Sequence, residues 1–524
     1  MAIRDLIRNR VNRMAESVDL FKKDVFELEG VPAFREYYNL FIFVWQAIYK
    51  GFYKAWHDVP VRTIKDPKGK HRTMSTMNAG KMACAQMARY VWNERCSITA
   101  SMENAPDDDP LNDFLQYVLK DNRFGTAFGD LLEKAFALGG GALKEWVEIP
   151  KDENGNDIGE GKIRIGYTMA SQFVPTAWDN SRINSAIFVS REAREGFYYS
   201  TVEWHRLDGN TYRVTNDLYR QPIKDGEPQN ILGWWYPLNE IYPLLSPDTT
   251  IRNVHNAFFQ YIRPFGANYA DDNSPLGMSI YAPALNTLHG LDIMFDSLQR
   301  EFVLGKKRII APARAMKTMI INGSRPERYF DADDEVWEAL ATDNPEDLKV
   351  YDNSVDLRIA PHLDGINGDL SILCAQIGFD PGTLSFDASS GLKTATEVIS
   401  ENSKTFGTVK AHENIIADSL REMVDAIFEL AVHYGLTWQG QTIESLIANG
   451  YEVSVKFDDS IIQDKDAEIN QGTMMVGAGL MSKKKFMMDT LGYTEEVADR
   501  ELAQISAESR SNSVEVTRLF GGME

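Results

Sequence analysis

The sequence has few cysteines and lacks the long apolar segments of membrane proteins. Its 524 residues include three cysteines, Cys84, Cys96 and Cys374, which are odd in number, scattered and without a CxxC pair. A disulfide framework or a structural zinc site is therefore not expected, and we interpret the thiols as free. The longest apolar runs, such as Phe41–Trp45, fall far short of the roughly 20 residues that span a membrane. Residues 1–14 lack the apolar stretch of a signal peptide, so we expect the protein to be made and kept in a cytoplasm.

Positive charge is also scarce. The chain has 55 Lys and Arg residues against 76 Asp and Glu residues, which gives a formal net charge of -21 at pH 7. Sequence-specific DNA-binding proteins are usually basic, because contacts with phosphates supply much of their affinity. The composition therefore argues against tight binding of DNA. It does not argue against a conduit through which DNA moves, because tight binding would impede that movement.

The motifs of common enzyme classes are missing. Gly139-Gly140-Gly141 lacks the GKS or GKT of a phosphate-binding loop, and we interpret it as a break between a helix and a strand. His412-Glu413 begins an HExxH pattern, but Ile416 stands where the second zinc ligand belongs, so we interpret the pair as part of a polar helix face. The acidic runs Asp107–Asp109 and Asp331–Glu335 could hold Mg²⁺ but are typical of solvated surfaces. We therefore expect no catalytic residue, cofactor or metal.

The apolar content is sufficient for packed cores, with 44% hydrophobic and 11% aromatic residues. Residues 1–140 read as mostly helical, with an aromatic-rich core segment at 34–56 and a helix start at Pro110. From 142 to 243, short β-branched and aromatic runs alternate with turn signals such as Asp208-Gly209-Asn210, which predicts antiparallel hairpins. The chain is therefore expected to be α+β, without the βαβ rhythm of a nucleotide-binding fold.

The second half of the chain has a distinctive order of elements. A strongly periodic helix is predicted at 283–304, where apolar residues recur in steps of three and four. A small mixed segment, helical character at 369–377 and a Gly- and Ser-containing loop at 380–392 follow. A long helix is then predicted at 394–434, with Gly407 as the expected position of a bend. The remaining predicted elements are strand-like pieces at 348–351 and 355–359, a strand at 451–457, and short helices at 467–480, 483–491 and 495–509.

Three stretches of this half resemble portal proteins of tailed bacteriophages, of the siphophage type. Residues 274–312 are similar to the family's first stem helix and its entry into the clip. Residues 370–416 resemble the second stem helix, the tunnel loop and the long wing helix, and TATEVISENSKT at 394–405 is the most specific part. Residues 479–505 are similar to the helices on the crown side. The likeness covers roughly half of the chain, from 260 to 510.

The resemblance implies a portal fold with a helical crown, an α/β wing, a helical stem and a small α/β clip. Such subunits assemble as rings, typically of twelve copies. The implied division is 1–279 for the N-terminal helices and β-rich wing, 280–304 for the first stem helix, 305–360 for the clip, 361–379 for the second stem helix, 380–392 for the tunnel loop, 393–462 for the long kinked helix and wing return, and 463–524 for the crown and C-terminal tail.

The resemblance also implies residue roles. Apolar residues of the first stem helix are expected to pack neighbouring subunits, namely Leu288, Leu291, Phe295, Leu298 and Phe302. Acidic residues of the same helix, Asp292, Asp296 and Glu301, are candidates for the channel side. The tunnel loop would meet DNA through Thr383, Ser385, Asp387, Ser389, Ser390 and Lys393, the alternative being a plain connector between helices. In the clip, Lys306, Lys307 and Arg308 would make weak, salt-sensitive contacts with DNA or be solvated surface charges, and Trp337 would be either a partner anchor or a core residue.

The implied function is a dodecameric channel for double-stranded DNA at one capsid vertex, used in genome packaging, head-tail joining and DNA ejection. The implied partners are the terminase, a head-completion adaptor, and the major capsid and scaffolding proteins, with no membrane. The protein would reside in the virion after assembly in the host cytoplasm. Two alternatives remain open: a capsid or head-tail connector protein without a channel, and a packaging enzyme of the terminase kind. The latter would need a Walker motif or a two-metal carboxylate set, and neither is visible in the sequence.

Overall fold

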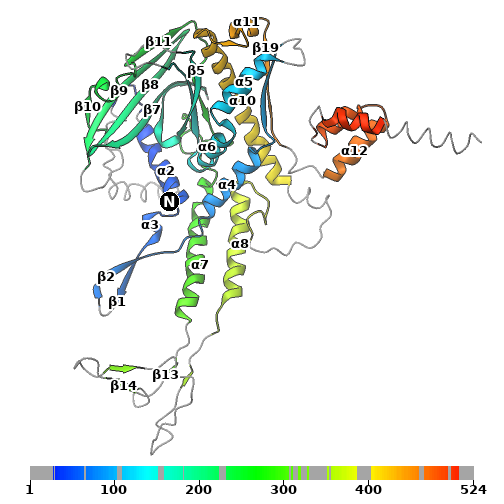
Figure 1. Cartoon of the computed structure of the whole chain (residues 1–524). Helices are drawn as coiled ribbons and strands as arrows, with labels where there is room; N and C mark the ends of the chain where they lie inside the picture. Colours follow the sequence, from blue (N-terminus) through cyan, green and yellow to red (C-terminus); the bar gives the residue numbers. More distant parts are fainter. Residues whose placement is uncertain are drawn as a thin grey trace, which may run out of the picture.

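The computed structural model of the chain combines helices with antiparallel sheets, which confirms the expected α+β class. In Figure 1 most of the strands and helices form an upper body, from which two long helices, α7 (Leu285–Leu304) and α8 (Ile359–Ile377), extend side by side. The structure describes residues 28, 30–32, 34–63, 66–102, 109–150, 159–180, 182–223, 232–305, 309–310, 317–319, 327–329, 351–352, 356–385, 403–458, 465–491, 493 and 497–506.

The N-terminal part is largely helical, as predicted, but it also contains three strands that were not predicted. The aromatic segment supplies core residues: Tyr38 and Trp45 are 2% and 1% exposed and pack edge to face. Phe52, at the end of the same segment, is exposed instead. The elements in chain order are α2 (Phe34–Tyr49), α3 (Lys54–His57), β1 (Asp58–Thr63), β2 (Asp66–Thr73), α4 (Ala79–Val91), β3 (Ser97–Met102), α5 (Pro110–Asp121) and α6 (Phe124–Leu138).

Two local predictions in this part are confirmed. Helix α5 begins at Pro110, and the side chain of Asp109 accepts hydrogen bonds from the N–H groups of Leu111 and Asn112, so this acidic residue caps a helix. Gly139 and Gly140 lie between α6 and strand β4 (Gly141–Glu148), which begins at the third glycine. Gly139 has a φ of 81°, and a Cβ on Gly140 would collide with the ring of Tyr261, so glycine is required at this break.

The region from 141 to 262 consists of antiparallel strands, which confirms the predicted hairpins. A three-stranded sheet has the order β12-β4-β5, and a six-stranded sheet has the order β10-β9-β8-β7-β6 with β11 also paired to β9. The turn at Gly209-Asn210 joins β8 to β9. The further bounds are β5 (Lys162–Met169), β6 (Phe173–Asp179), β7 (Arg182–Arg194), β8 (Phe197–Asp208), β9 (Thr211–Pro222), β10 (Trp234–Tyr236), β11 (Asp248–Arg252), β12 (Phe259–Ile262), and the short 3-10 helices η1 (Ala170–Gln172), η2 (Leu238–Glu240) and η3 (Ala282–Ala284).

A partly buried chain of polar side chains joins the two sheets. The Lys144 ammonium on β4 lies 2.6 Å from a carboxylate oxygen of Glu203 on β8, whose other oxygen lies 2.8 Å from Nε2 of His205. Burial would raise the pKa of Glu203, but His205 and Lys144 lower it. The ring of His205 packs edge-on against Phe188 and Phe259. The charges inside this part of the molecule are therefore paired within the single chain.

Glu145 follows Lys144 on β4 and is only 2% exposed. Burial raises the pKa of its carboxyl to about 8, while the hydrogen bond with Gln260 acts in the opposite direction. This group therefore carries its proton at neutral pH. A neutral carboxyl avoids most of the cost of burying a charge in a packed core.

The C-terminal elements return to the same body. Helix α10 (Ser403–His433) packs against β12, β4 and α4 and is continuous through Gly407. The predicted strand is confirmed as β19 (Tyr451–Lys456), which pairs with β3. The predicted short helices are found as α12 (Lys465–Gly477), α13 (Lys483–Asp489) and a helical stretch at 497–506. The remaining small elements are β17 (Thr437–Trp438), β18 (Gln441–Thr442) and α11 (Ile443–Ile447).

Between α7 and α8, only four short strands are described. They form two antiparallel pairs, β13 (Ile309–Ile310) with β16 (Tyr351–Asp352) and β14 (Lys317–Met319) with β15 (Glu327–Tyr329). The prediction of strand-like residues up to 359 is wrong at its end, because α8 begins at Ile359. Among the described residues, no helix combines the length and apolar character needed to cross a membrane.

Candidate functional site

Helices α7 and α8 are held together by apolar contacts and by side-chain hydrogen bonds near both ends. Near one end, the Thr287 hydroxyl donates a hydrogen bond of 2.8 Å to the Gln376 side chain. Near the other, Arg358 donates two side-chain hydrogen bonds, of 3.1 and 3.0 Å, to Glu301. These bonds, with one from the Arg358 N–H, lower the pKa of Glu301 to about 2. The two helices therefore keep a fixed register in one chain.

The expected channel-side position of Asp292 and Asp296 is wrong. Both residues are buried, at 6% and 5% exposure, and both face the segment that follows β2. Asp296 accepts two hydrogen bonds of 2.8 Å from Arg72 and one from the Ser75 N–H. Burial acts to raise the pKa of Asp296, but these bonds lower it below its usual value. These carboxylates hold the subunit together and do not line an open surface.

Asp292 is the centre of a second buried cluster. It accepts hydrogen bonds from the Thr76 hydroxyl at 2.8 Å and from the Met77 N–H at 2.9 Å. Nε2 of His57 lies 3.0 Å from its other oxygen. Because Nδ1 of His57 accepts a hydrogen bond from the Tyr53 N–H, Nε2 carries the proton that is donated to Asp292.

The apolar seam of α7 also differs from its expected role. Leu288, Leu291 and Leu298 are buried in the core of their own chain, so their side chains leave no surface for a neighbouring subunit. Phe295 is half-buried, and Phe302 is 50% exposed. Of the five predicted packing residues, Phe302 has the largest free surface. Helical periodicity identified the apolar residues but not which partner they pack against.

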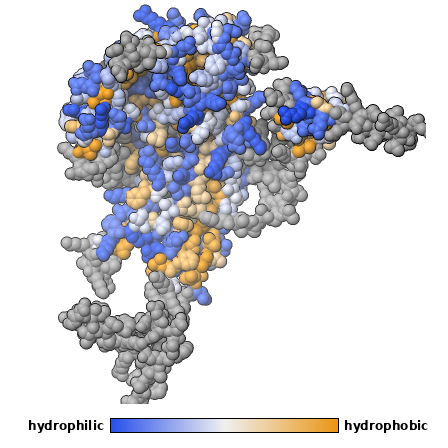
Figure 2. All heavy atoms as spheres, in the orientation of Figure 1, coloured by the Kyte–Doolittle hydropathy of each residue, from blue (hydrophilic) through white to orange (hydrophobic). Residues whose placement is uncertain are grey.

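The end of the stem exposes a different apolar surface. Phe302, Val303 and Leu304 close α7 and are 50%, 63% and 52% exposed, and Leu357 lies just before α8 with 39% exposed. Farther along the helices, Ile293 and Ile372 are 46% and 50% exposed. Figure 2 shows hydrophobic atoms gathered over the lower part of the stem. Contiguous apolar surface of this kind is typical of a contact with another protein.

The predicted tunnel loop leaves α8 at a tightly built junction. Gly378 ends α8 with a φ of 89°, and Phe379 and Asp380 are buried. Asp380 and Thr405 bond reciprocally: the Asp380 N–H donates to the Thr405 hydroxyl at 2.8 Å, and the Thr405 N–H donates to the Asp380 carboxylate at 2.7 Å. The Thr408 hydroxyl also donates to the Gly378 carbonyl. The chain is thereby fastened on both sides of residues 386–402.

The predicted loop residues fall on both sides of this boundary. Thr383 is half-buried and donates its hydroxyl to the Asp380 carbonyl at 2.9 Å, and Ser385 is exposed. The other loop candidates, Asp387, Ser389, Ser390 and Lys393, lie outside the described residues. The clip candidates Lys306, Lys307, Arg308 and Trp337, and the acidic run Asp331–Glu335, lie outside them as well.

His412 and Glu413 do not lie on a polar face, which corrects the interpretation drawn from the sequence. Both are 2% exposed on the packed side of α10. Nδ1 of His412 accepts a hydrogen bond of 2.8 Å from the Phe265 N–H, and burial lowers the pKa of the imidazole to about 4. Glu413 lies 2.9 Å from the Lys410 ammonium. Within the part of the chain that the structure describes, no group of three His, Cys, Asp or Glu side chains is placed to hold a metal ion.

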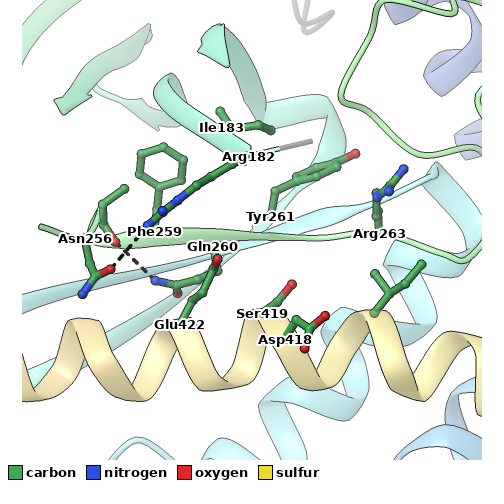
Figure 3. Close-up of a pocket in the computed structure, with 12 residues that line it drawn as sticks. Arg182, Ile183, Asn256, Phe259, Gln260, Tyr261, Arg263, Asp418, Ser419 and Glu422 are labelled. Atoms are coloured by element: carbon green, nitrogen blue, oxygen red, sulfur yellow. Dashed lines mark hydrogen bonds between the residues drawn. The ribbon is translucent and has the colours of Figure 1, made fainter. Parts of the chain in front are cut away.

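A pocket of about 280 Å³ lies between α10 and β12. In Figure 3, Arg182 and Arg263 approach it from the strand side, while Asp418, Ser419 and Glu422 line it from α10. Its charged groups are of both signs, and its lining contains no cysteine or histidine. The pocket is therefore a polar cleft lined by charges of both signs.

The hairpin β1–β2 and its anchoring to α7 were missed by sequence reasoning. A signal was present, because Val59, Val61 and Thr63 alternate with other residues in the period of a strand. No local pattern relates Arg72 to Asp296, because 224 positions separate the two residues.

The described residues form a two-helix stem and a β-rich body, and the charged groups Arg72, Asp296, Lys144 and Glu203 are bonded within the chain. Residues 42–515 match the sequence model described as phage portal protein, SPP1 Gp6-like, and the chain therefore belongs to this family. This confirms the resemblance to tailed-phage portal proteins and places the protein among virion components. No curated protein matched the chain.

Proposed function

We propose that the chain forms a closed head-to-tail ring of roughly twelve copies, whose central hole is the channel for double-stranded DNA at one capsid vertex. The observation that carries this proposal is the exposed apolar end of the stem. Phe302, Val303 and Leu304 are each at least half exposed, although the same helix buries Leu291 completely. Apolar surface on a second side of a helix pair gains stability when another copy covers it.

The junction at Asp380 and Thr405 supports the loop assignment. Its reciprocal hydrogen bonds hold the end of α8 and the start of α10 together, independently of the residues between them. The core on either side of residues 386–402 is therefore held by bonds in which those residues take no part. We assign the tunnel loop to 380–392, with Ser385, Asp387 and Lys393 among the residues that meet DNA.

The charge of the chain supports a conduit. Twelve copies with a net charge of -21 would carry about 250 negative charges, which repel phosphates and discourage sticking. We assign the weak contacts with DNA to Lys393 and to Lys306, Lys307 and Arg308. Such contacts weaken as salt rises, because counterions compete with the phosphates.

In this proposal the channel serves genome packaging, head-tail joining and DNA ejection, after assembly in the host cytoplasm. The clip, with Trp337, would dock the terminase during packaging and the head-completion adaptor afterwards. The body would contact the major capsid and scaffolding proteins. The second candidate is a connector protein without a channel. Such a protein would have no use for the junction formed by Asp380 and Thr405. No observation favours a packaging enzyme.

The ring is tested by the mass and shape of the purified protein. We expect sedimentation to give about 0.7 MDa for twelve copies of the 59.2 kDa chain, and electron micrographs to show rings with a central hole. A monomer, or an assembly without a hole, would overturn the proposal.

The loop is tested by deleting residues 386–390. This deletion leaves Asp380, Thr383 and Thr405 in place, so the junction and the rings should remain intact. We expect phage assembled with the shortened protein to package or retain much less DNA. Packaging at the wild-type level would contradict the loop assignment.

A further inference from the structure

Strands β1 and β2 form a hairpin that pairs with no other strand in the described part of the chain. It is a two-stranded sheet whose strands pair with each other from Asp58–Thr73 to Thr63–Asp66. In Figure 1 it extends away from the body beside α7. Pro60, Lys70 and His71 are exposed on it. A lone two-stranded sheet is marginally stable in water, so such an element is expected to gain stability from a further contact.

The base of the hairpin is nevertheless fixed. Arg72, near the end of β2, donates two hydrogen bonds of 2.8 Å to Asp296 of α7. Directly after the hairpin, the Ser75 N–H bonds to Asp296, and Thr76 bonds to Asp292. The direction of the hairpin relative to α7 is therefore set within one chain, which is what a contact surface requires.

The register of the stem shows which part of α8 lies at the height of this base. A Cβ on Gly365 would meet the sulfur of Met294, and Arg358 bonds to Glu301. Asp296 lies between Met294 and Glu301, so its level on the antiparallel α8 is near residue 363. Asp364 is exposed at this level, in a stripe at four-residue spacing with Gly368 and Ile372.

The two surfaces have opposite charge. Helix α8 contains Asp364 and Asp369 but no lysine or arginine. On the hairpin, Arg72 is bonded to Asp296 and His71 lies 2.6 Å from Asp58, while β2 also presents the exposed cation Lys70. Lys70 and Asp364 are both exposed, and neither side chain forms a hydrogen bond or ion pair with another described residue, so both are available for an ion pair.

Ring geometry brings these surfaces together. Copies in a cyclic ring are related by rotation about the axis, so equivalent levels of the stem coincide in neighbouring copies. A head-to-tail contact joins two different sides of the subunit. The hairpin extends from the side of α7 that is away from α8 (Figure 1), so it meets the opposite side of the next copy.

We propose that the hairpin β1–β2 of each subunit docks on the α8 stripe Asp364, Gly368 and Ile372 of the next subunit, with Lys70 paired to Asp364. This inference rests on the proposed ring. The absence of a large side chain at Gly368 lets the strand approach the helix closely, and Ile372 supplies apolar contact. The hairpin is then a clamp that fixes the angle between neighbouring stems.

Charge exchange tests the ion pair. Lys70→Glu and Asp364→Lys are each expected to raise the protein concentration needed for half-assembly about tenfold at low salt, and the double variant is expected to restore it. Lys162→Glu, an equal charge change at an exposed position of β5, is the control and should leave assembly unchanged. Single variants that assemble like the control would overturn the pairing.

Crosslinking tests the docking itself. In rings of the variant with Lys70→Cys and Asp364→Cys, mild oxidation should yield a ladder of covalent multimers, and each single variant should yield none. Native Cys84 and Cys374 are buried and Cys96 is partly exposed, so the single variants also measure the background reaction of Cys96. If the wild type forms rings but the double-cysteine variant yields no ladder, the docking of the hairpin is refuted and the proposed ring is not. A wild-type protein that forms no ring would refute the proposed function first.

Discussion

The β-rich body and the two-helix stem differ in how much of their apolar surface is covered within one chain. In the body, Phe173, Phe188 and Phe259 from both sheets are buried against one another, and the charges between the sheets are paired. In the stem, α7 buries Leu291 fully but leaves Ile293, two residues on, 46% exposed. The core between the sheets is therefore completed within one chain, although Trp234 and Trp235 on β10 are 71% and 63% exposed at the edge of the body. The proposed ring would cover the exposed apolar side of the stem, so assembly should change the stem and leave the core of the sheets unchanged.

The largest effect on folding free energy is expected at Leu291, which is buried within its own chain. Leu291→Asp places a charge at a position with 0% exposure and should cost about 4 kcal/mol or more of folding free energy. We expect loss of soluble, cooperatively unfolding protein, measured by yield and denaturant titration. Ile293→Asp is the matched control and should fold normally. If both variants fold equally well, the two sides of α7 have been assigned wrongly.

A smaller loss is expected at the anchor of the hairpin. Arg72→Met removes the cation from the buried Asp296 carboxylate and should cost about 2 kcal/mol at neutral pH. The pKa of Asp296 is lowered in the folded state, so its contribution is present above the unfolded pKa and is lost as pH falls through the folded one. The difference between variant and wild type should therefore shrink in acid. Equal stability at neutral pH would show that the pair is not an anchor.

The body should respond to pH in the opposite direction through Glu145. Its pKa is raised to about 8, so between about pH 4.5 and 8 the unfolded chain releases a proton that the folded chain keeps. Stability should fall across this range by up to about 1.4 kcal/mol per pH unit. Glu145→Gln should remove this slope and stabilise the protein by about 2 kcal/mol at pH 7. An unchanged slope in thermal unfolding curves would contradict the assignment.

The smallest effect on the single subunit is expected at the free end of the stem. Phe302→Ser changes a side chain that is 50% exposed, so the unfolding free energy of dissociated subunits should stay within about 0.5 kcal/mol. Ring formation should weaken strongly, because the side chain is removed from the proposed interface. Light scattering, recorded as a function of protein concentration, measures ring formation. Normal assembly would show that the apolar end faces something other than a neighbour.

Much of the secondary structure could be predicted because it depends on local patterns. The steps of three and four predicted α7, the turn before Pro110 predicted α5, and the alternation from 142 to 243 predicted the hairpins. The local pattern predicted only the second half of α8, at 369–377, whereas the resemblance to portal proteins placed the second stem helix at 361–379. Pro361 lies in its first turn, where proline is tolerated, and Gly365 and Gly368 weaken the helical pattern.

The errors share a physical cause, which is that burial depends on distant partners. Asp292 and Asp296 look like exposed acids on a helix, but residues more than 200 positions away bury them. His412 likewise looks polar until Phe265 covers it. The family could be predicted from the stretches at 274–312, 370–416 and 479–505, because it depends on many residues together and tolerates these local errors.

Hydrogen exchange of assembled and dissociated protein tests the difference between body and stem most directly. On assembly, the amides of α7, α8 and the hairpin β1–β2 should gain protection, while β6 to β9 should keep the exchange rates of the single subunit. Protection gained in the sheets with no change in the stem would contradict the account.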